Sequence, residues 1–432
     1  MYVDDEEHKS THGRRDSAAL QECPLSTLLS THKVPGLHVM CFTGNSGQVP
    51  DHVCVFKDGM ERSLCSHSMQ ITGDESAADL VVALKGLLRL KKKRVNSPDP
   101  TLFTASGRLI AGHQTLLDLG IPSYRRSLVL CEGGTWAWPP VYVGFTRPIH
   151  HLVEATGEEG RKGIALRTVS MRPRVFEVKH FLEEVEVRQV LEKAGPHVER
   201  SDVVLKDADH GREAEDWRTS RNYFLSSLED EILMQLDERV QNLTRVPAGN
   251  SEHAQVLRYD YMGRYVAHHD YFDPKDYAKD PDILDMIGHG AYNRFATVFM
   301  YMSDVEEGGE TLFPNHNGRH NGNFSQCVHG YKVKPEYRKV IIFYDMHPSG
   351  ALDAESLHAG CRVMNGTKWS ANYWIWNTAM GYKTSDEHSE MMLRLHTWDE
   401  AADRREEAEV WQLHLSTTAT FDSQAPVKDD LE

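Results

Sequence analysis

The chain has 432 residues, of which 40% are hydrophobic and 26% are charged, values that are usual for a globular protein. Its length predicts two or three domains rather than one. The formal net charge of −16 argues against a nucleic-acid-binding protein, because such a protein needs a clustered basic surface to bind phosphates.

The N-terminal stretch MYVDDEEHKSTHGRRDS is polar and mixed in charge, without the apolar core of a signal peptide. The most apolar segment, residues 80–90, is interrupted by Lys85 and Arg89, so neither a membrane span nor a membrane partner is expected. Seven cysteines in a long chain do not indicate a disulfide framework. We therefore expect a cytoplasmic protein with Cys327 and Cys361 as free thiols, although the sequence leaves a bridge between them open. If the N-terminus is incomplete, the lumen of the endoplasmic reticulum is the alternative.

Residues 1–50 show no steady periodicity and are predicted to form a flexible N-terminal segment. Residues 51–132 have the alternating and helical patterns of a small folded module. The expected elements are strands at 52–56 and 62–71, an amphipathic helix at 77–88, a strand–turn–strand unit at 101–112, and a last strand from residue 127. This order resembles a β-grasp (ubiquitin-like) module. Because it holds no catalytic constellation, we interpret it as a packing module or a site for a protein partner.

Residues 133–171 include the Trp- and Pro-rich stretch TWAWPPVYVGFTRP and are predicted to be a connector. Two amphipathic helices follow, with apolar stripes at 187–194 and 228–243 that we interpret as core packing. After residue 254 the apolar period changes to two, in short aromatic and β-branched runs separated by turn residues. This order predicts an α+β fold in which helices pack on one side of an antiparallel sandwich or barrel. Residues 381–432 are predicted to be an acidic C-terminal helix and tail.

The stretch AHHDYFDP, residues 267–274, places two histidines and an aspartate side by side. Since alternate residues of a strand share a face, His268 and Asp270 can bind one ion, whereas His269 points away. A lone His-x-Asp pair is more often a surface or hydrogen-bonded pair than a metal site. A third ligand such as His358 would complete a two-histidine, one-carboxylate face, which suits ferrous iron because it leaves open positions.

Lys368 lies in the aromatic strand GTKWSANYWIWN, where an unpaired ammonium is costly. Alternation places it on one face with four other residues, Ser370, Asn372, Trp374 and Trp376. An inward ammonium would suit a dicarboxylate co-substrate. An outward lysine on a solvated face remains the alternative from this strand alone.

From about residue 172 to 377 the chain resembles the prolyl 4-hydroxylase family of Fe(II)/2-oxoglutarate-dependent dioxygenases. The matching motifs are RTS at 218–220, QVLRYDYMGRYVAHHDYF at 255–272, NRFATVFMYMSDVEEGGETLFP at 293–314, and SLHAGCRVMNGTKWSANYWIW at 356–376. The resemblance implies a double-stranded β-helix, or distorted jelly roll, with supporting helices over residues 172–380. It also implies Fe(II), 2-oxoglutarate, O2 and ascorbate as cofactors and co-substrates, and a proline-containing peptide or protein as the substrate.

The resemblance assigns roles to ten residues of this chain. The implied iron ligands are His268, Asp270 and His358. The implied 2-oxoglutarate-binding residues are Lys368, Tyr259, Thr297 and Trp374. The implied substrate-binding residues are Tyr265, Arg294 and Trp376.

Two departures from the family pattern bear on the substrate. Trp376 stands where the family often has a histidine, and the insert at 275–290 is predicted to be a mobile loop because of Gly288 and Gly290. Two alternatives to peptidyl-proline hydroxylation therefore stay open. One is the same chemistry on another residue or a small molecule, and the other is a non-catalytic binding protein that works through residues 51–132.

Overall fold

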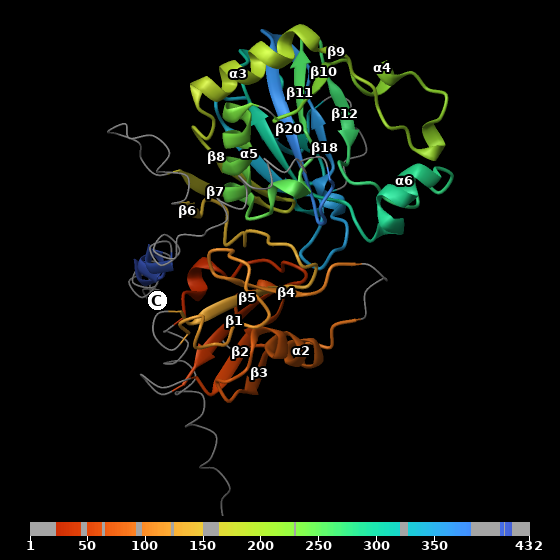
Figure 1. The fold of residues 1–432 in the computed structure, drawn as a ribbon. Coiled ribbons are helices and arrows are strands. Elements are labelled where there is room, and N and C mark those ends of the chain that lie inside the picture. Colours follow the sequence, from red (N-terminus) through yellow and green to blue (C-terminus); the bar gives the residue numbers. More distant parts are fainter. Residues whose placement is uncertain are drawn as a thin grey trace, which may run out of the picture. The chain divides into compact units, whose positions relative to one another are not determined.

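The computed structural model describes residues 23–44, 50–62, 65–91, 97–121, 125–149, 164–228, 230–319, 327–381, 407–409 and 411–416 (Figure 1). The chain divides into two compact units. The first unit comprises Met1–Lys92, Pro100–Glu132 and Glu400–Glu432, and the second comprises Lys93–Asp99 and Gly133–Asp399. Among the described helices, none has the length and apolarity needed to span a membrane.

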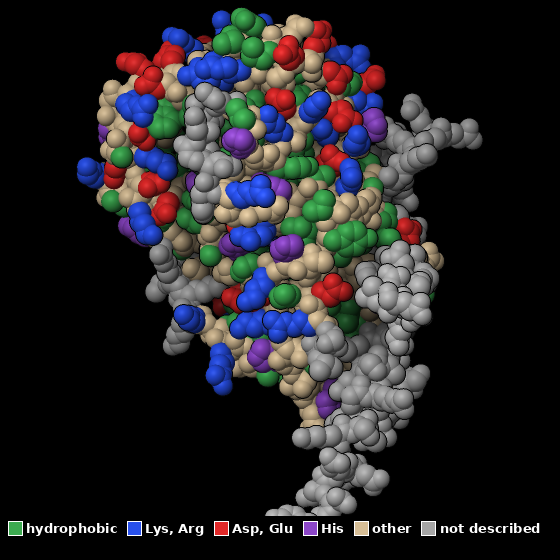
Figure 2. All heavy atoms as spheres, turned by 180° about the vertical axis from the view of Figure 1, so that it is seen from behind, with side chains coloured by type: hydrophobic (Ala, Val, Ile, Leu, Met, Phe, Trp, Pro, Cys, Tyr) green, Lys and Arg blue, Asp and Glu red, His purple; other side chains and the backbone are tan. Residues whose placement is uncertain are grey.

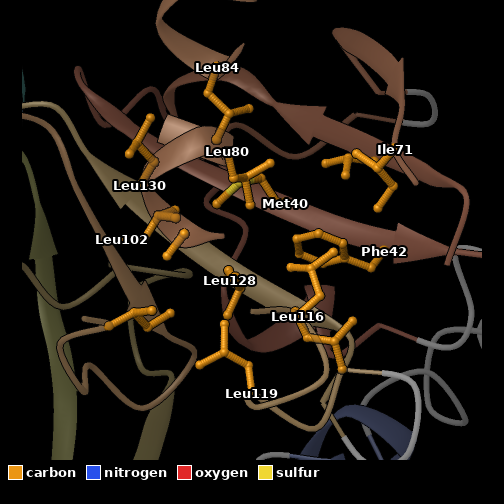
Figure 3. Packing of buried hydrophobic residues seen from close by; sticks show 14 of the residues in the cluster. Met40, Phe42, Ile71, Leu80, Leu84, Leu102, Leu116, Leu119, Leu128 and Leu130 are labelled. Atoms are coloured by element: carbon orange, nitrogen blue, oxygen red, sulfur yellow. The ribbon is translucent and has the colours of Figure 1, made fainter. Parts of the chain in front are cut away.

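The described residues of the first unit form a five-stranded antiparallel sheet on which helix α2 packs. The strand order is β3 (His67–Gln70), β2 (His52–Phe56), β1 (Leu37–Thr43), β5 (Ser127–Cys131) and β4 (Thr101–Thr104). Helix α2 (Ala77–Leu87) begins at Ser76, whose hydroxyl accepts a hydrogen bond from the Asp79 N–H in a capping box. Its apolar stripe, Leu80 and Leu84, packs with Met40 and Phe42 of β1 and with Leu128 of β5 (Figure 3).

Strand β1 lies at the centre of this sheet, so the prediction that residues 1–50 form a flexible segment is wrong for Leu37–Thr43. Leu37, Val39 and Cys41 lie on one face and Met40 and Phe42 on the other, and a strand with apolar residues on both faces is buried on both sides. The two strands and the helix expected first in residues 51–132 are present as β2, β3 and α2, and two of the three later strands are present as β4 and β5. The second strand expected within 101–112 is wrong, because only an isolated bridge joins Leu109 to Phe103. Because β1 is antiparallel to both neighbours, β2 and β5 run parallel but are separated by it.

The second unit holds two main antiparallel sheets, as expected from the period-two runs. The larger contains β6 (Thr146–Pro148), β7 (Ala165–Met171), β8 (Arg174–Val178), β17 (Val340–Tyr344), β13 (Arg294–Tyr301), β20 (Lys368–Trp376), β11 (Ala254–Tyr259), β10 (Arg221–Leu225) and β9 (Glu199–Arg200) in spatial order. The smaller contains β12 (Tyr265–His268), β18 (His358–Gly360), β15 (Thr311–Phe313) and β16 (Tyr331–Val333). Strands β14 (Glu307–Gly308) and β19 (Val363–Asn365) form a separate pair.

The core of this unit takes its members from both sheets, among them Leu257, Phe299 and Phe343 of the larger and Phe313 and Val333 of the smaller. Two sheets that face each other across a shared apolar core form a sandwich, which agrees with a jelly roll. Helices α3 (Glu184–Ala194) and α5 (Glu231–Thr244) contact each other, and α3 contacts β10 (Figure 1). They confirm the two amphipathic helices, and a short helix α4 (Ala214–Trp217) follows α3.

Residues 133–171 are not only a connector, because they supply β6 and β7 to the edge of the larger sheet. Trp136 and Trp138 are fully buried, and the Trp138 indole donates a hydrogen bond to the Leu243 carbonyl at 2.7 Å. The Trp-rich stretch is therefore part of the folded unit. Of the predicted acidic C-terminal helix, residues 407–409 and 411–416 are helical and the remaining positions after Gly381 lie outside the described residues.

The insert at 275–290 is a packed segment rather than the predicted mobile loop. It contains α6 (Pro281–Met286), and Ile287 at its end is fully buried in a cluster with Tyr277 and Trp376. Three apolar side chains in contact give the insert a core of its own. Gly288 and Gly290 adopt positive φ angles of 51° and 92°, so they serve the turn after α6.

Two disulfides join described cysteines, Cys23–Cys41 and Cys327–Cys361. The expectation of free thiols at Cys327 and Cys361 is therefore wrong. Cysteine spacing alone could not reveal this pairing, because residues 34 apart meet only after β15, β16 and β18 have assembled.

Figure 2 shows one face of the molecule, on which basic and acidic side chains are interspersed over the second unit.

Candidate functional site

Three predicted ligand residues converge at the end of the smaller sheet. Strands β12 and β18 are antiparallel neighbours, and His268 is paired directly with His358 (Figure 1). Asp270 comes two residues after His268, the last residue of β12, so its carboxylate lies on the same side of the chain as the His268 imidazole. His268 Nε2 lies 3.6 Å from Asp270 Oδ1, and His358 Nε2 lies 3.6 Å from Asp270 Oδ2. The three potential ligand atoms all lie within 4.8 Å of one another, a spacing that suits one metal ion.

The hydrogen bonds of the two histidines orient Nε2 toward this common point. His268 Nδ1 lies 2.8 Å from the Val266 carbonyl, and His358 Nδ1 lies 3.0 Å from the Ser356 carbonyl. Since a carbonyl oxygen only accepts, each Nδ1 carries the proton and donates it. A histidine whose Nδ1 is bound in this way presents an unprotonated Nε2 to a metal.

The ionisation states also suit a divalent cation. Burial lowers the pKa of His358 to about 4, so its imidazole is neutral at neutral pH. Burial works against the Asp270 carboxylate, but His358, His268 and Arg294 together hold the pKa of Asp270 well below its usual range. A metal requires neutral imidazoles and an ionised carboxylate, and His358 and Asp270 already have these states. Two nitrogens and one oxygen are the donor set of a facial triad for Fe(II).

Thr297 on β13 contacts the ligand carboxylate instead of the co-substrate position predicted for it. Its Oγ1 lies 2.6 Å from Asp270 Oδ2 and 3.0 Å from Asp345 Oδ2, and it is fully buried. In the sheet register Thr297 is opposite Trp374, whereas Lys368 is six residues away along β20. The prediction that Thr297 and Lys368 hold the same carboxylate is therefore wrong, because six strand residues span roughly 20 Å.

Lys368 points inward, as predicted, into an aromatic enclosure. It is 2% exposed, and its Nζ lies 5.0 Å from the Phe299 ring centroid and 5.5 Å from those of Tyr259 and Tyr301. Burial lowers the pKa of Lys368 to about 7, while Glu310 acts in the opposite direction. A buried ammonium of this kind gains most from a carboxylate ligand that restores its charge.

Thr311 is a polar residue of this enclosure that the sequence reasoning missed. Its Oγ1 lies 2.8 Å from the Tyr301 hydroxyl, and both side chains are buried. The adjoining Gly309 lies against Lys368, since a Cβ atom added there would be 3.5 Å from Lys368 Cδ. The GGET motif at 308–311 was the available signal. Its threonine was overlooked because only the fold shows that the motif reaches Lys368.

A groove of about 790 Å³ opens beside the metal ligands and contains His268 and Asp270 in its lining. Its aromatic lining residues are Tyr223, Phe224, Tyr265, Tyr271, Phe272, Tyr277 and Trp374. The Tyr265 ring stacks on His268 with centroids 3.5 Å apart, and the Arg218 guanidinium lies 4.4 Å from the Tyr265 centroid. Tyr265 therefore lies on the wall of a groove that leads to the metal ligands. Trp374 lines the same groove, and because it is opposite Thr297 and six residues from Lys368 along β20, the prediction that it binds 2-oxoglutarate together with Lys368 is wrong.

Arg294 also lines the groove, but its donors are engaged within the protein. Nε and Nη2 donate to the two carboxylate oxygens of Glu252 at 2.7 and 2.9 Å, and Nη1 donates to the Asp270 carbonyl at 3.3 Å. The guanidinium lies 3.5 Å from the Trp374 ring centroid. Arg294 thus fixes the backbone of a ligand residue.

Trp376 does not reach the groove, so direct substrate contact is a wrong prediction for it. It is 1% exposed and its indole Nε1 donates to Glu252 at 2.6 Å. Its ring packs with Phe272, Tyr277 and Ile287. Trp376 influences the groove indirectly, because the Glu252 carboxylate that it binds also binds Arg294 in the groove wall. Strand alternation alone could not reveal this, because the insert that covers Trp376 comes from a distant part of the sequence.

Comparison with known proteins places this geometry in a family. Residues 254–376 match the 2OG-Fe(II) oxygenase superfamily. The chain is 33% identical over 225 residues to probable prolyl 4-hydroxylase 9 of Arabidopsis thaliana, covering 51% of this chain and 74% of the relative. It is 37% identical over 225 residues to probable prolyl 4-hydroxylase 8 of the same plant, covering 50% and 73%. A crystal structure of a viral collagen prolyl hydroxylase of Paramecium Bursaria Chlorella virus-1, a 2OG complex, is 25% identical, with 47% and 95% covered and a TM-score of 0.33.

Proposed function

Because the chain belongs to the prolyl 4-hydroxylase family of 2OG-Fe(II) oxygenases, we propose that it hydroxylates a prolyl residue of a peptide or protein. It is an Fe(II)-, 2-oxoglutarate- and O2-dependent enzyme of this class. One observation supports the proposal best: His268, Asp270 and His358 are gathered around one point, and His268 and Asp270 line an open aromatic groove.

We assign the iron to His268 Nε2, His358 Nε2 and the Asp270 carboxylate, which fit it in donor type and protonation state. The distal carboxylate of 2-oxoglutarate is assigned to Lys368 Nζ, with Tyr259 and Thr311 as hydroxyl donors. Bound iron supplies oxygen activation coupled to decarboxylation of 2-oxoglutarate, which yields succinate and CO2. Lys368 then acts by orientation, since a fixed distal carboxylate determines where the keto-acid end of the co-substrate lies.

The groove is suited to a proline-rich segment. Tyr223, Phe224 and Trp374 present aromatic faces to it, and the Phe224 side chain is 48% exposed. Extended proline-rich peptides dock on aromatic-lined grooves at low entropic cost because they are already ordered. Tyr265 stands between this surface and His268, so it would place the proline ring next to the iron. Arg294 contributes by holding the groove wall through Glu252 and Trp374.

Three further expectations belong to this proposal. Ascorbate would be required as the reductant that keeps the iron ferrous. The first unit would bind a protein partner, and its relation to a β-grasp module rests on the order β2, β3, α2, β4, β5.

The two disulfides favour an oxidising compartment, so we propose the endoplasmic reticulum lumen rather than the cytoplasm as the location of the protein. Mass spectrometry of the protein from its native cells, alkylated without reduction, would test this by showing whether Cys327 and Cys361 are blocked.

The proposed activity can be tested on matched peptides. The enzyme with Fe(II), 2-oxoglutarate and ascorbate should add one oxygen to a proline-rich peptide and none to its proline-to-alanine counterpart. Tandem mass spectrometry would locate the oxygen. Equal modification of both peptides would favour the same chemistry on another residue. Turnover with small molecules alone would show that the substrate is not a peptide.

A further inference from the structure

A hydrogen-bonded chain of three side chains runs from the metal site into the core. Asp345 follows β17 and is 0% exposed, and its backbone N–H donates to the Phe295 carbonyl at 2.9 Å. Its Oδ2 lies 3.0 Å from Thr297 Oγ1, which lies 2.6 Å from Asp270 Oδ2. Thr297 is therefore placed between two buried carboxyl groups.

The number of hydrogens on Thr297 restricts the protonation of these carboxyl groups. A threonine hydroxyl carries one hydrogen, and an ionised carboxylate can only accept. Two ionised carboxylates would therefore compete for one hydrogen. In one of the two short contacts, the lone pairs of two oxygen atoms would then face each other with no hydrogen between them. Both contacts become hydrogen bonds when one carboxyl group carries a proton. That proton donates to Thr297 Oγ1, and the hydroxyl of Thr297 donates to the other carboxyl group.

The surroundings decide which carboxyl group is protonated. Asp270 faces the imidazoles of His268 and His358, so its charge is compensated. A charge on Asp345 would be less well compensated, because Arg294 is itself bound in bidentate fashion by Glu252, and the other groups that favour the ionised form are the neutral hydroxyls of Thr297 and Ser356. Burial and the charge of Asp270 raise the pKa of Asp345 well above its usual range, which agrees with this assignment.

We propose that Asp345 is a positioning residue of the iron site, which as a neutral carboxylic acid donates to Thr297 so that Thr297 donates to Asp270 Oδ2. The relay occupies one oxygen of Asp270 and leaves the other for the metal. It also fixes the plane of the carboxylate, as partners of metal-bound carboxylates commonly do. The inference rests on the proposed iron site, but not on the identity of the substrate.

The hydroxyl of Thr297 can be tested by metal binding alone. The probe is Co(II) titrated into the metal-free full-length protein by calorimetry, without co-substrate or peptide. Thr297→Val removes the hydroxyl at nearly constant volume and should weaken Co(II) binding by about tenfold to a hundredfold, the usual range for such partners. Thr297→Ser keeps the hydroxyl and should bind within about threefold of the wild type, a change smaller than that range. Wild-type affinity in Thr297→Val would overturn the proposal.

The protonation of Asp345 is tested by a matched pair of variants. In Asp345→Asn the amide donates as the acid does, so Co(II) affinity should be retained. In Asp345→Ala the donor that orients the Thr297 hydroxyl is lost while the hydroxyl itself remains, so affinity should fall, but by less than in Thr297→Val. An affinity loss in Asp345→Asn as large as in Asp345→Ala would show that an ionised Asp345 is needed, against the proposal. If Asp345→Ala does not fold, an infrared difference spectrum between wild type and Asp345→Asn decides: a missing carboxylic-acid carbonyl band contradicts the proposal.

If the wild type itself fails to bind Co(II), the iron site is wrong and the relay falls with it. If it binds Co(II) with the predicted pattern but hydroxylates no proline peptide, the relay stands and the substrate assignment fails.

Discussion

The ammonium of Lys368 makes 2-oxoglutarate binding depend on pH. Burial lowers the pKa of Lys368 to about 7, far below that of an exposed lysine. The carboxylate ligand needs the charged form, so the apparent affinity equals the intrinsic affinity multiplied by the protonated fraction. Below pH 7 the ammonium is present and the affinity is constant. Above pH 7 the protonated fraction of Lys368 falls, and the affinity for 2-oxoglutarate should weaken by about tenfold, or ~1.4 kcal/mol, per pH unit.

Calorimetry of 2-oxoglutarate binding to the Co(II)-loaded protein between pH 6 and 9 would measure this dependence. Repeating the titration in buffers of different ionisation enthalpy should show that Lys368 takes up close to one proton for each 2-oxoglutarate bound at pH 8. Lys368→Arg is the matched control, because a guanidinium keeps its charge throughout this range. Its affinity should not decline with pH. A wild-type affinity that stays flat up to pH 9, or an equal decline in Lys368→Arg, would refute the assignment of Lys368 to the co-substrate.

Three other substitutions test separate parts of the site. His358→Ala should abolish stoichiometric Co(II) binding, and full occupancy by metal analysis would remove His358 from the ligand set. Thr311→Val should weaken 2-oxoglutarate binding by about 0.5–1.5 kcal/mol, the usual worth of a neutral hydrogen bond, while Co(II) binding stays unchanged. Glu252→Gln should destabilise the fold by about 3–5 kcal/mol in denaturant unfolding, because it leaves Arg294 as an uncompensated buried charge. Removal of an exposed partner, as in Glu215→Gln, which faces the exposed Arg200, should cost less than about 1 kcal/mol.

Local rules of the sequence were enough to select two of the three metal ligands. The two-residue period of a strand separates His268 and Asp270 from His269. The structure places His269 on another side, where its Nε2 donates to the Ala354 carbonyl at 3.2 Å. The partnership with His358 came from the family resemblance. Its physical cause, the direct pairing of β12 and β18, is a long-range contact that periodicity cannot reveal.

Residues whose roles depend on long-range register were harder to predict. Thr297 and Thr311 both lie on strands that face the core, and only the pairing of β13 with β20 shows which one is near Lys368. Trp376 was assigned to the substrate site because it stands where the family often has a histidine, but the insert packs over it. Strand β1 was missed because the segment before it carries no clear period, although five of its own seven residues are apolar.

The central claim is that the iron trio and Lys368 serve the oxidation of a peptide-bound proline. The most direct measurement is the mass shift of a proline-rich peptide after incubation under 18O2 with Fe(II), 2-oxoglutarate and ascorbate. The account predicts one heavy oxygen on a proline for each succinate formed, and no incorporation in the Asp270→Ala variant. Succinate without labelled proline across a broad peptide library, or equal labelling by Asp270→Ala, would contradict it.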